Sequence, residues 1–127
     1  MKKELPTSPH LQIYKPQITS VLSITHRVTG FCMNLVLLIA SMWLVALALG
    51  EFYYNLFVSF FLTIPFKLIL IISLIGFNYH MLNGLRHMLW DLGFFLELRS
   101  SSILGYVVVI LSLTISAVTV FNLGIIR

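Results

Sequence analysis

The sequence predicts an all-α membrane protein with three transmembrane helices and a short N-terminal segment on the cytoplasmic side. Of its 127 residues, 59% are hydrophobic and only 9% are charged, whereas about 25% of the residues of a typical soluble domain carry a charge. The apolar residues are gathered into three long stretches, each of about the length that a helix needs to cross a hydrocarbon core. A bilayer is therefore the expected solvent for most of the chain.

Residues 1–27 are expected to form a polar N-terminal segment. Lysine and proline residues are spread along it: Lys2, Lys3, Pro6, Pro9, Lys15 and Pro16. A secretory signal peptide would instead place an apolar core of ~7–15 residues close to the start. The segment is therefore predicted to be retained and to lie outside the bilayer.

Two of the three apolar stretches contain no charged residue. The first is expected to span the membrane over residues 28–50, from Val28 to the position before Glu51. The last is expected to span it over residues 102–126, directly before Arg127. Because each stretch is at least as long as the ~20 residues needed for a helical crossing, both are predicted to be transmembrane helices.

The middle span contains Pro65 and Lys67, which determine where it can begin. Proline is costly inside a helix but tolerated in the first turn, and a lysine near a helix end can extend its ammonium group to the interface. The helix is therefore expected over residues 63–90, with an outer loop at 51–62 and an inner loop at 91–101. A separate span between Phe52 and Phe66 would be too short to cross.

The distribution of Lys and Arg predicts which side the N-terminus occupies. Six of the eight lie in the N-terminal segment or around the inner loop: Lys2, Lys3, Lys15, Arg27, Arg86 and Arg99. Because positive residues favour the cytoplasmic side, we expect a multi-pass protein of an inner, cytoplasmic-type membrane, with its N-terminus on the cytoplasmic or matrix side. The basic residues do not cluster as they do in nucleic-acid-binding domains, so nucleic acid is not an expected partner.

Polar residues at membrane depth are expensive, and they usually have a function. His80, Gly84, His87 and Asp91 are spaced i, i+4, i+7 and i+11, which places them on one face of the middle helix. His80 would lie ~15 Å from the inner end, close to mid-bilayer. A neutral imidazole there suits an axial haem ligand, and Gly84 would admit a flat macrocycle. His87 and Arg27 are placed to meet the anionic propionates.

The same residues also have a simpler interpretation, which their spacing does not exclude. A membrane histidine can hydrogen-bond to a neighbouring helix, and a glycine can ease helix packing. Arg27, with His26 at the start of the first span, can serve only as a topology anchor. No second histidine is expected at the depth of His80, because His26 and His87 lie near the inner surface and His10 lies outside. A second axial ligand would then have to come from another polypeptide.

Two sequence motifs resemble those of a known family. The first comprises Ser8-Pro9-His10-Leu11 with Ile13-Tyr14, followed by Ser23-Ile24-Thr25-His26-Arg27-Val28-Thr29-Gly30. The second runs from His80 through Gly84, Arg86 and His87 to Asp91. Together they are similar to the motifs of the cytochrome b membrane anchor subunits of succinate dehydrogenase, which is respiratory complex II.

The resemblance implies a function and a set of partners. It implies a three-helix anchor that packs with a second hydrophobic anchor subunit into a helical bundle, with one haem b shared between them. An iron–sulfur subunit and a flavoprotein subunit would complete the complex, and electrons from succinate would pass to ubiquinone. By motif position, His80 matches the axial haem ligand. His26, Arg27 and His87 match positions around the propionates, and Ser23 and Arg27 match quinone-site residues.

Succinate oxidation itself is not expected in this chain, and no catalytic residue is assigned. The sequence has no flavin fingerprint, no cysteine set for an iron–sulfur cluster and no soluble domain. Two other interpretations remain open: a haem-free structural anchor, and the anchor of a fumarate reductase that runs in the opposite direction. A transporter is disfavoured, because the sequence shows no inverted repeat and almost no charge in its first and last spans.

Overall fold

The computed structural model describes residues 15–125, and all helices and strands assigned in that part of the chain are α-helices. They are α1 (Ile18–Leu49), α2 (Glu51–Phe61), α3 (Ile64–Asp91) and α4 (Leu98–Asn122). Helices α1, α3 and α4 are long and apolar enough to cross a membrane, which confirms the predicted all-α membrane fold. Residues 1–14 of the predicted N-terminal segment, including His10, and the predicted end of the last span at Ile126 lie outside the described residues.

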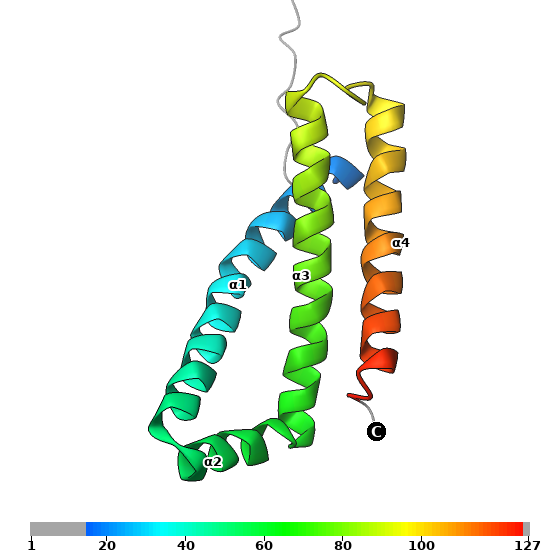
Figure 1. Ribbon diagram of the computed structural model, residues 1–127. Helices are drawn as coiled ribbons and strands as arrows, with labels where there is room; N and C mark the ends of the chain where they lie inside the picture. The colour runs from blue at the N-terminus through cyan, green and yellow to red at the C-terminus, as the bar shows by residue number, and fades with distance from the viewer. Residues whose placement is uncertain (1–14, 126–127) are drawn as a thin grey trace, which may run out of the picture.

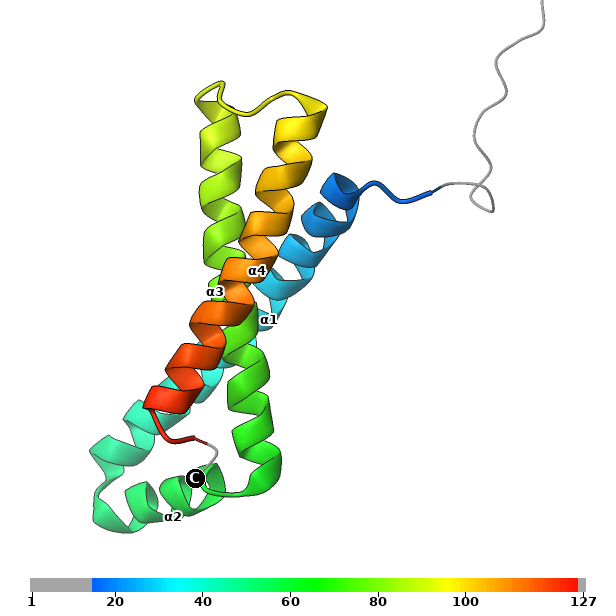
Figure 2. The same cartoon turned by 90° about the vertical axis from the view of Figure 1, so that its right-hand side faces the viewer.

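The three long helices run alternately up and down, and α2 joins two of them (Figure 1). Helices α3 and α4 lie side by side, whereas α1 approaches α3 near one end and leans away from it toward the other (Figures 1 and 2). We call the end with the 92–97 connection the loop end and the opposite end the α2 end. The N-terminus of α1 lies at the loop end, so three crossings bring the end of α4 to the α2 end.

Helix α1 begins at Ile18, ten residues before the expected start of the first span at Val28, so the helix extends into the predicted N-terminal segment. Pro16 and Gln17 precede the first turn, and neither proline nor glycine occurs again before Gly30. Leu22 is buried against α3 and α4, where it packs in the hydrophobic core of the bundle. Tertiary packing therefore extends the helix beyond the point where continuous hydropathy ends.

The segment expected to be an outer loop at 51–62 instead contains the eleven-residue helix α2. Gly50 has φ = 105°, a conformation that favours glycine, and this residue separates α1 from α2. The first turn of α2 carries Glu51, which suits the positive end of the helix dipole. The Phe61 ring packs against Phe57 and Phe66, at centroid distances of 4.5 and 4.1 Å. The helix is too short to cross a bilayer.

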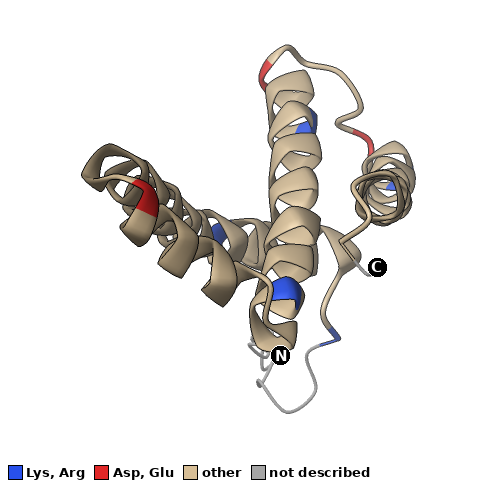
Figure 3. Ribbon diagram, turned by 60° about the horizontal axis from the view of Figure 1, so that its bottom comes forward, with Lys and Arg blue, Asp and Glu red and all other residues tan. Residues whose placement is uncertain are grey.

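Helix α3 begins with Pro65 in its first turn and agrees with the expected range within one residue at each end. Helix α4 begins at Leu98, which reduces the expected inner loop to residues 92–97. Most large apolar side chains of the described chain are exposed. Charged residues are sparse along the helices (Figure 3). Lipid and partner helices can cover such a surface, because neither requires it to be polar.

Polar and small residues fill the contact between α3 and α4. Asn78 donates to the Ser116 hydroxyl across 2.9 Å, and Arg86 donates to the carbonyl and hydroxyl oxygens of Ser101 across 3.1 and 3.3 Å. At Gly105 a Cβ atom would lie 2.6 Å from Leu22 Cδ1, so only glycine fits without a shift. Small residues and interhelical hydrogen bonds are the usual means of joining helices in a membrane, where both lipid and core are apolar.

Candidate functional site

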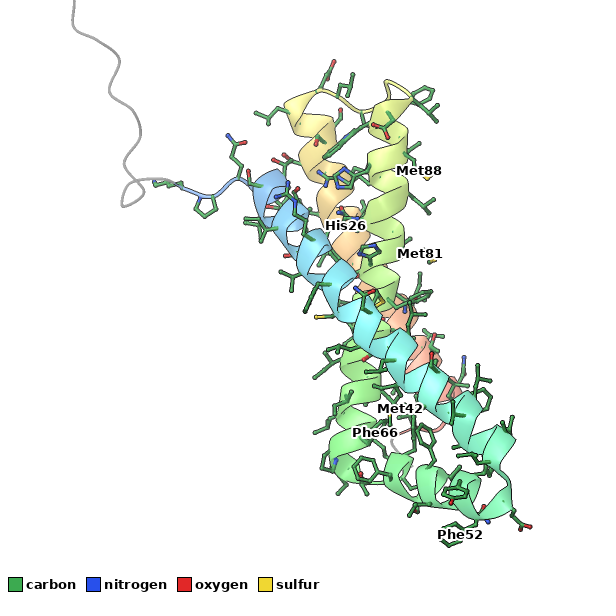
Figure 4. The ribbon with its side chains drawn as sticks, turned by 90° about the vertical axis from the view of Figure 1, so that its left-hand side faces the viewer. His26, Met42, Phe52, Phe66, Met81 and Met88 are labelled. Atoms are coloured by element: carbon green, nitrogen blue, oxygen red, sulfur yellow. The ribbon has the colours of Figure 1, made fainter. Side chains whose placement is uncertain are left out.

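An open groove of about 670 Å³ lies between α1 and α3 toward the loop end. Its lining includes every residue that the sequence singled out for the site: Ser23, His26, Arg27, His80, Gly84 and His87. Met81, Leu85 and Met88 complete it from α3. In Figure 4, His26 and the two methionines lie in the half of the molecule away from α2. Residues 23–30 of the first motif thus meet the second motif in space, whereas residues 8–14 lie outside the described chain.

Each helix presents its residues at helical spacing. On α1, Ser23 is followed by His26 and Arg27 at i+3 and i+4, so all three share a face. This arrangement exists because α1 begins at Ile18, which makes residues 23–30 of the first motif helical. On α3, His80, Gly84 and His87 share a face, as their spacing predicted.

The imidazole of His80 is held by α1. Its Nδ1 lies 3.1 Å from the backbone carbonyl oxygen of His26 and 3.2 Å from Thr29 Oγ1. A carbonyl oxygen only accepts hydrogen bonds, so Nδ1 must carry the proton. The Thr29 hydroxyl donates its own hydrogen to the carbonyl of Thr25 or His26 and can accept from His80. The neutral ring therefore has its lone pair on Nε2, the atom that remains free to bind a metal.

Gly30 provides the space that His80 occupies. A Cβ atom at Gly30 would lie 2.9 Å from His80 Cε1, closer than real Cβ contacts allow. Thr29 and Gly30 were not assigned to the site from the sequence, although both belong to the first motif. Gly30 lies one turn beyond His26 on the same face of α1, and Thr29 lies beside it. This helical spacing is the one local signal that could have identified them.

The prediction that no second histidine lies at the depth of His80 is wrong for His26. The two rings are stacked with centroids 3.9 Å apart and planes 8° from parallel. The error arose from placing His26 at the end of a helix that in fact begins two turns earlier and leans across α3. Axial ligands bind an iron from opposite faces of its macrocycle, so two rings stacked face to face are not arranged as a ligand pair.

His87 and Gly84 complete the α3 side. The His87 ring lies 5.3 Å from that of His26, tilted by 51°. Asn83 Nδ2 lies 3.4 Å from His87 Nε2. At Gly84 a Cβ atom would lie 3.8 Å from His26 Cε1, an ordinary contact, so Gly84 widens the groove without being required by the packing of this chain.

The sequence places Arg86 among the charges expected to orient the protein in the membrane, but in the structure this residue is buried. Its side chain is 1% exposed, packs between α3 and α4, and lies 4.1 Å above the Trp90 ring. Successive residues of a helix are rotated by about 100°, so Arg86 faces α4 while His87 faces the groove. Sequence spacing could have shown this separation, but not the burial.

The donor set fits a haem better than a bare metal ion. In residues 15–125 no group of three or more His, Cys, Asp or Glu side chains could hold a metal ion. A haem brings four ring nitrogens and needs only axial ligands from protein, and His80 offers one oriented nitrogen. Within residues 15–125, His26 Nδ1 is buried with no hydrogen-bond partner, as expected of a polar atom whose partner belongs to a bound group.

The chain is similar to one family of respiratory membrane subunits. A family model described as succinate dehydrogenase/fumarate reductase transmembrane subunit matches residues 1–119. The succinate dehydrogenase cytochrome b560 subunit of Marchantia polymorpha is 45% identical over 103 residues, covering 77% of this chain and 75% of that protein. The cytochrome b556 subunit of Rickettsia typhi is 39% identical over 111 residues, covering 87% and 86%. The cytochrome b560 subunit of Reclinomonas americana is 42% identical over 112 residues, covering 80% and 74%.

Proposed function

This chain belongs to the succinate dehydrogenase/fumarate reductase transmembrane subunit family, and from that premise we propose that it supplies half of a haem b site and part of a ubiquinone site. As a family member it is a multi-pass membrane anchor of the cytochrome b type. The observation that carries the proposal is the meeting of both motifs in one groove, with His80 Nε2 left free to bind.

His80 is the proposed axial ligand to haem b. Its Nδ1–H is bonded to the His26 carbonyl and lies beside the Thr29 hydroxyl, which fixes the tautomer and makes Nε2 a better donor to iron. Bound there, haem b would supply a one-electron carrier near the middle of the membrane. Because His26 stacks on His80, the opposite axial ligand is proposed to come from a second hydrophobic anchor subunit.

His26, Arg27 and His87 are the proposed partners of the haem propionates. All three line the groove, with His26 beside His80, and His87 about two turns closer to the loop end on α3. Propionates are anions that must leave the hydrocarbon, and a guanidinium binds a carboxylate through two parallel hydrogen bonds. His26 Nδ1, which has no partner among the described residues, would be a further donor for such a group in the tautomer that carries its proton there.

Ser23 and Arg27 are the proposed ubiquinone-site residues. They are one turn apart on α1, and within residues 15–125 neither side chain is engaged in a hydrogen bond. A quinone carbonyl gains negative charge as it is reduced, and a guanidinium with a hydroxyl donor stabilises that charge. Arg27 also lines the groove with His26 and His80, so it can serve both sites.

The remaining partners follow from family membership. We propose that the loop end faces the cytoplasm or matrix and docks the iron–sulfur subunit, with the flavoprotein subunit beyond it. Succinate oxidation then belongs to those subunits, and this chain conducts the electrons to ubiquinone. The positive residues at this end support that orientation.

The haem assignment is tested by replacing His80 with alanine in the purified complex. We expect loss or strong perturbation of the haem b absorbance spectrum, because the iron loses an axial ligand. Met81→Leu is the matched control, since Met81 lines the same groove and carries no proposed role. An unchanged spectrum at full haem occupancy would refute the ligand assignment, and a wild-type complex without haem would favour the haem-free structural anchor.

A further inference from the structure

Arg86 is buried with an arrangement of partners that anchoring alone does not explain. Its NH2 group binds the carbonyl and hydroxyl oxygens of Ser101 on α4, its NH1 group donates to Asn83 Oδ1 across 3.2 Å, and its plane lies over the Trp90 ring. All of these partners are neutral, and the Nε donor has no partner within the described chain. Burying a guanidinium without a carboxylate is expensive, which suggests a role in positioning.

Asn83 connects Arg86 to the groove. Its side chain is fully buried at 0% exposure, and the oxygen and nitrogen of its amide face different partners. Arg86 can only donate hydrogen bonds, so it fixes Asn83 Oδ1 on its own side. The amide nitrogen is thereby left facing His87 Nε2, at 3.4 Å.

The orientation of Asn83 determines the tautomer of His87. An amide nitrogen donates, so His87 Nε2 must present its lone pair and the ring proton must lie on Nδ1. Trp90 contacts the same ring edge to face, at 5.0 Å and 85°, and Trp90 is itself covered by Arg86. Both neighbours that hold His87 are thus held by Arg86.

We propose that Asn83 and Arg86 are positioning residues that hold His87 as a neutral Nδ1–H donor toward the haem propionate in the groove. The inference rests on the proposed function, because the haem propionate to which His87 would donate belongs to that proposal. It also links α4 to the site: Ser101 does not line the groove, yet it accepts hydrogen bonds from the guanidinium on which Asn83 depends.

The test compares haem midpoint potentials in the intact complex, measured by redox titration of the haem absorbance. We expect Asn83→Leu to retain haem and to shift the potential in the same direction as His87→Ala. The double variant should show no larger shift than His87→Ala alone, because Asn83 acts only through His87. Arg86→Lys should shift the potential the same way, since an ammonium group cannot make the same set of contacts.

The matched control is Asn78→Leu, which removes another buried amide that joins α3 to α4 but bonds to Ser116. It should leave the haem potential unchanged even if it lowers stability. If Asn83→Leu prevents assembly, Asn83→Asp keeps the size and the Arg86 contact while removing the donor, and it should also shift the potential.

An Asn83 variant with the wild-type potential, or a shift that adds to that of His87→Ala, would overturn the inference while leaving the haem assignment intact. The absence of any shift in His87→Ala would overturn it as well. Absence of haem from the wild-type complex, or full haem in His80→Ala, would instead refute the proposed function.

Discussion

At the scale of single residues, the backbone of α1 determines what His80 can do. The His26 carbonyl holds the proton on His80 Nδ1, and Gly30 leaves room for the ring. Both contributions come from main-chain atoms or from the absence of a side chain. The residue type at such a position therefore does not predict this role from the sequence, whereas the imidazole and guanidinium side chains nearby do indicate a site.

Gly30→Ala should lower haem occupancy or alter the haem spectrum, because the added methyl would lie 2.9 Å from His80 Cε1 and displace the ring. The measurement is the ratio of haem absorbance to protein in the purified complex. Gly76→Ala is the control, since its Cβ would meet Met33 and Thr29 at ordinary distances of 3.7 and 3.8 Å. Both variants gain the same helix propensity, up to ~1 kcal/mol for alanine over glycine, so they differ only in their contacts. Equal haem loss in both variants would therefore contradict the proposed packing role of Gly30.

Arg27→Ala should reduce succinate-driven quinone reduction by roughly tenfold to a hundredfold, as expected from losing a charged hydrogen bond of about 1.5–3 kcal/mol. Reduction of an artificial dye by the soluble subunits should change much less, because that reaction bypasses the membrane site. Ser23→Ala should act in the same direction but more weakly, since a neutral hydrogen bond contributes ~0.5–1.5 kcal/mol. Equal loss of both activities would indicate failed assembly.

At the scale of helices, the contact between α3 and α4 depends on small and polar residues. Asn78 with Ser116 and Arg86 with Ser101 join the two helices by hydrogen bonds, and Gly105 allows Leu22 of α1 to enter between them. Tyr79 on α3 donates to the Leu22 carbonyl across 2.7 Å and fixes α1 at the same place. The three helices therefore meet around Leu22.

Gly105→Ala should destabilise the complex by about 1–3 kcal/mol, the usual range for overpacking a filled contact, because its Cβ would lie 2.6 Å from Leu22 Cδ1. Thermal denaturation of the purified complex measures the effect. Leu22→Ala should destabilise the wild-type complex but do less harm in the Gly105→Ala background, where it relieves the clash. Strictly additive losses would show that the two positions are not in contact.

At the scale of the whole molecule, the chain is a surface for lipid and partners more than a closed bundle. Helix α1 contacts α3 near the loop end and leans away toward the α2 end (Figure 1). The groove is likewise open on one side, where the proposed second anchor subunit would complete the proposed haem site. The same asymmetry places the site residues near the loop end and α2 at the other.

Cysteine labelling checks the orientation of the molecule. In a Cys32→Ser background, Ser59→Cys in α2 should react with a membrane-impermeant maleimide added to the outer face of intact membranes. Glu97→Cys, directly before α4, should react only after permeabilisation, because the positive residues favour the inner side for the loop end. The reverse pattern would contradict the proposed orientation.

The sequence by itself determined the membrane class, the presence of three long apolar helices, the extent of the middle one and the shared face of His80, Gly84 and His87. These features are local: hydropathy over about 20 residues and the helical repeat depend only on neighbours along the chain. For the same reason, the middle helix was predicted within one residue at each end. Both motifs were recognised from residue order, and the six predicted site residues line one groove.

Only the tertiary structure decided how far α1 extends, that α2 is helical, and which atoms hold His80 and His87. Packing of Leu22 against α3 and α4 extends α1 into a segment of lower hydropathy, and this brings His26 onto His80. The roles of Thr29, Gly30, Asn83 and Arg86 come from contacts between helices that no spacing along one helix reveals. Hydropathy and periodicity assign residues to a face, but the hydrogen bonds that orient an imidazole depend on which backbone lies opposite.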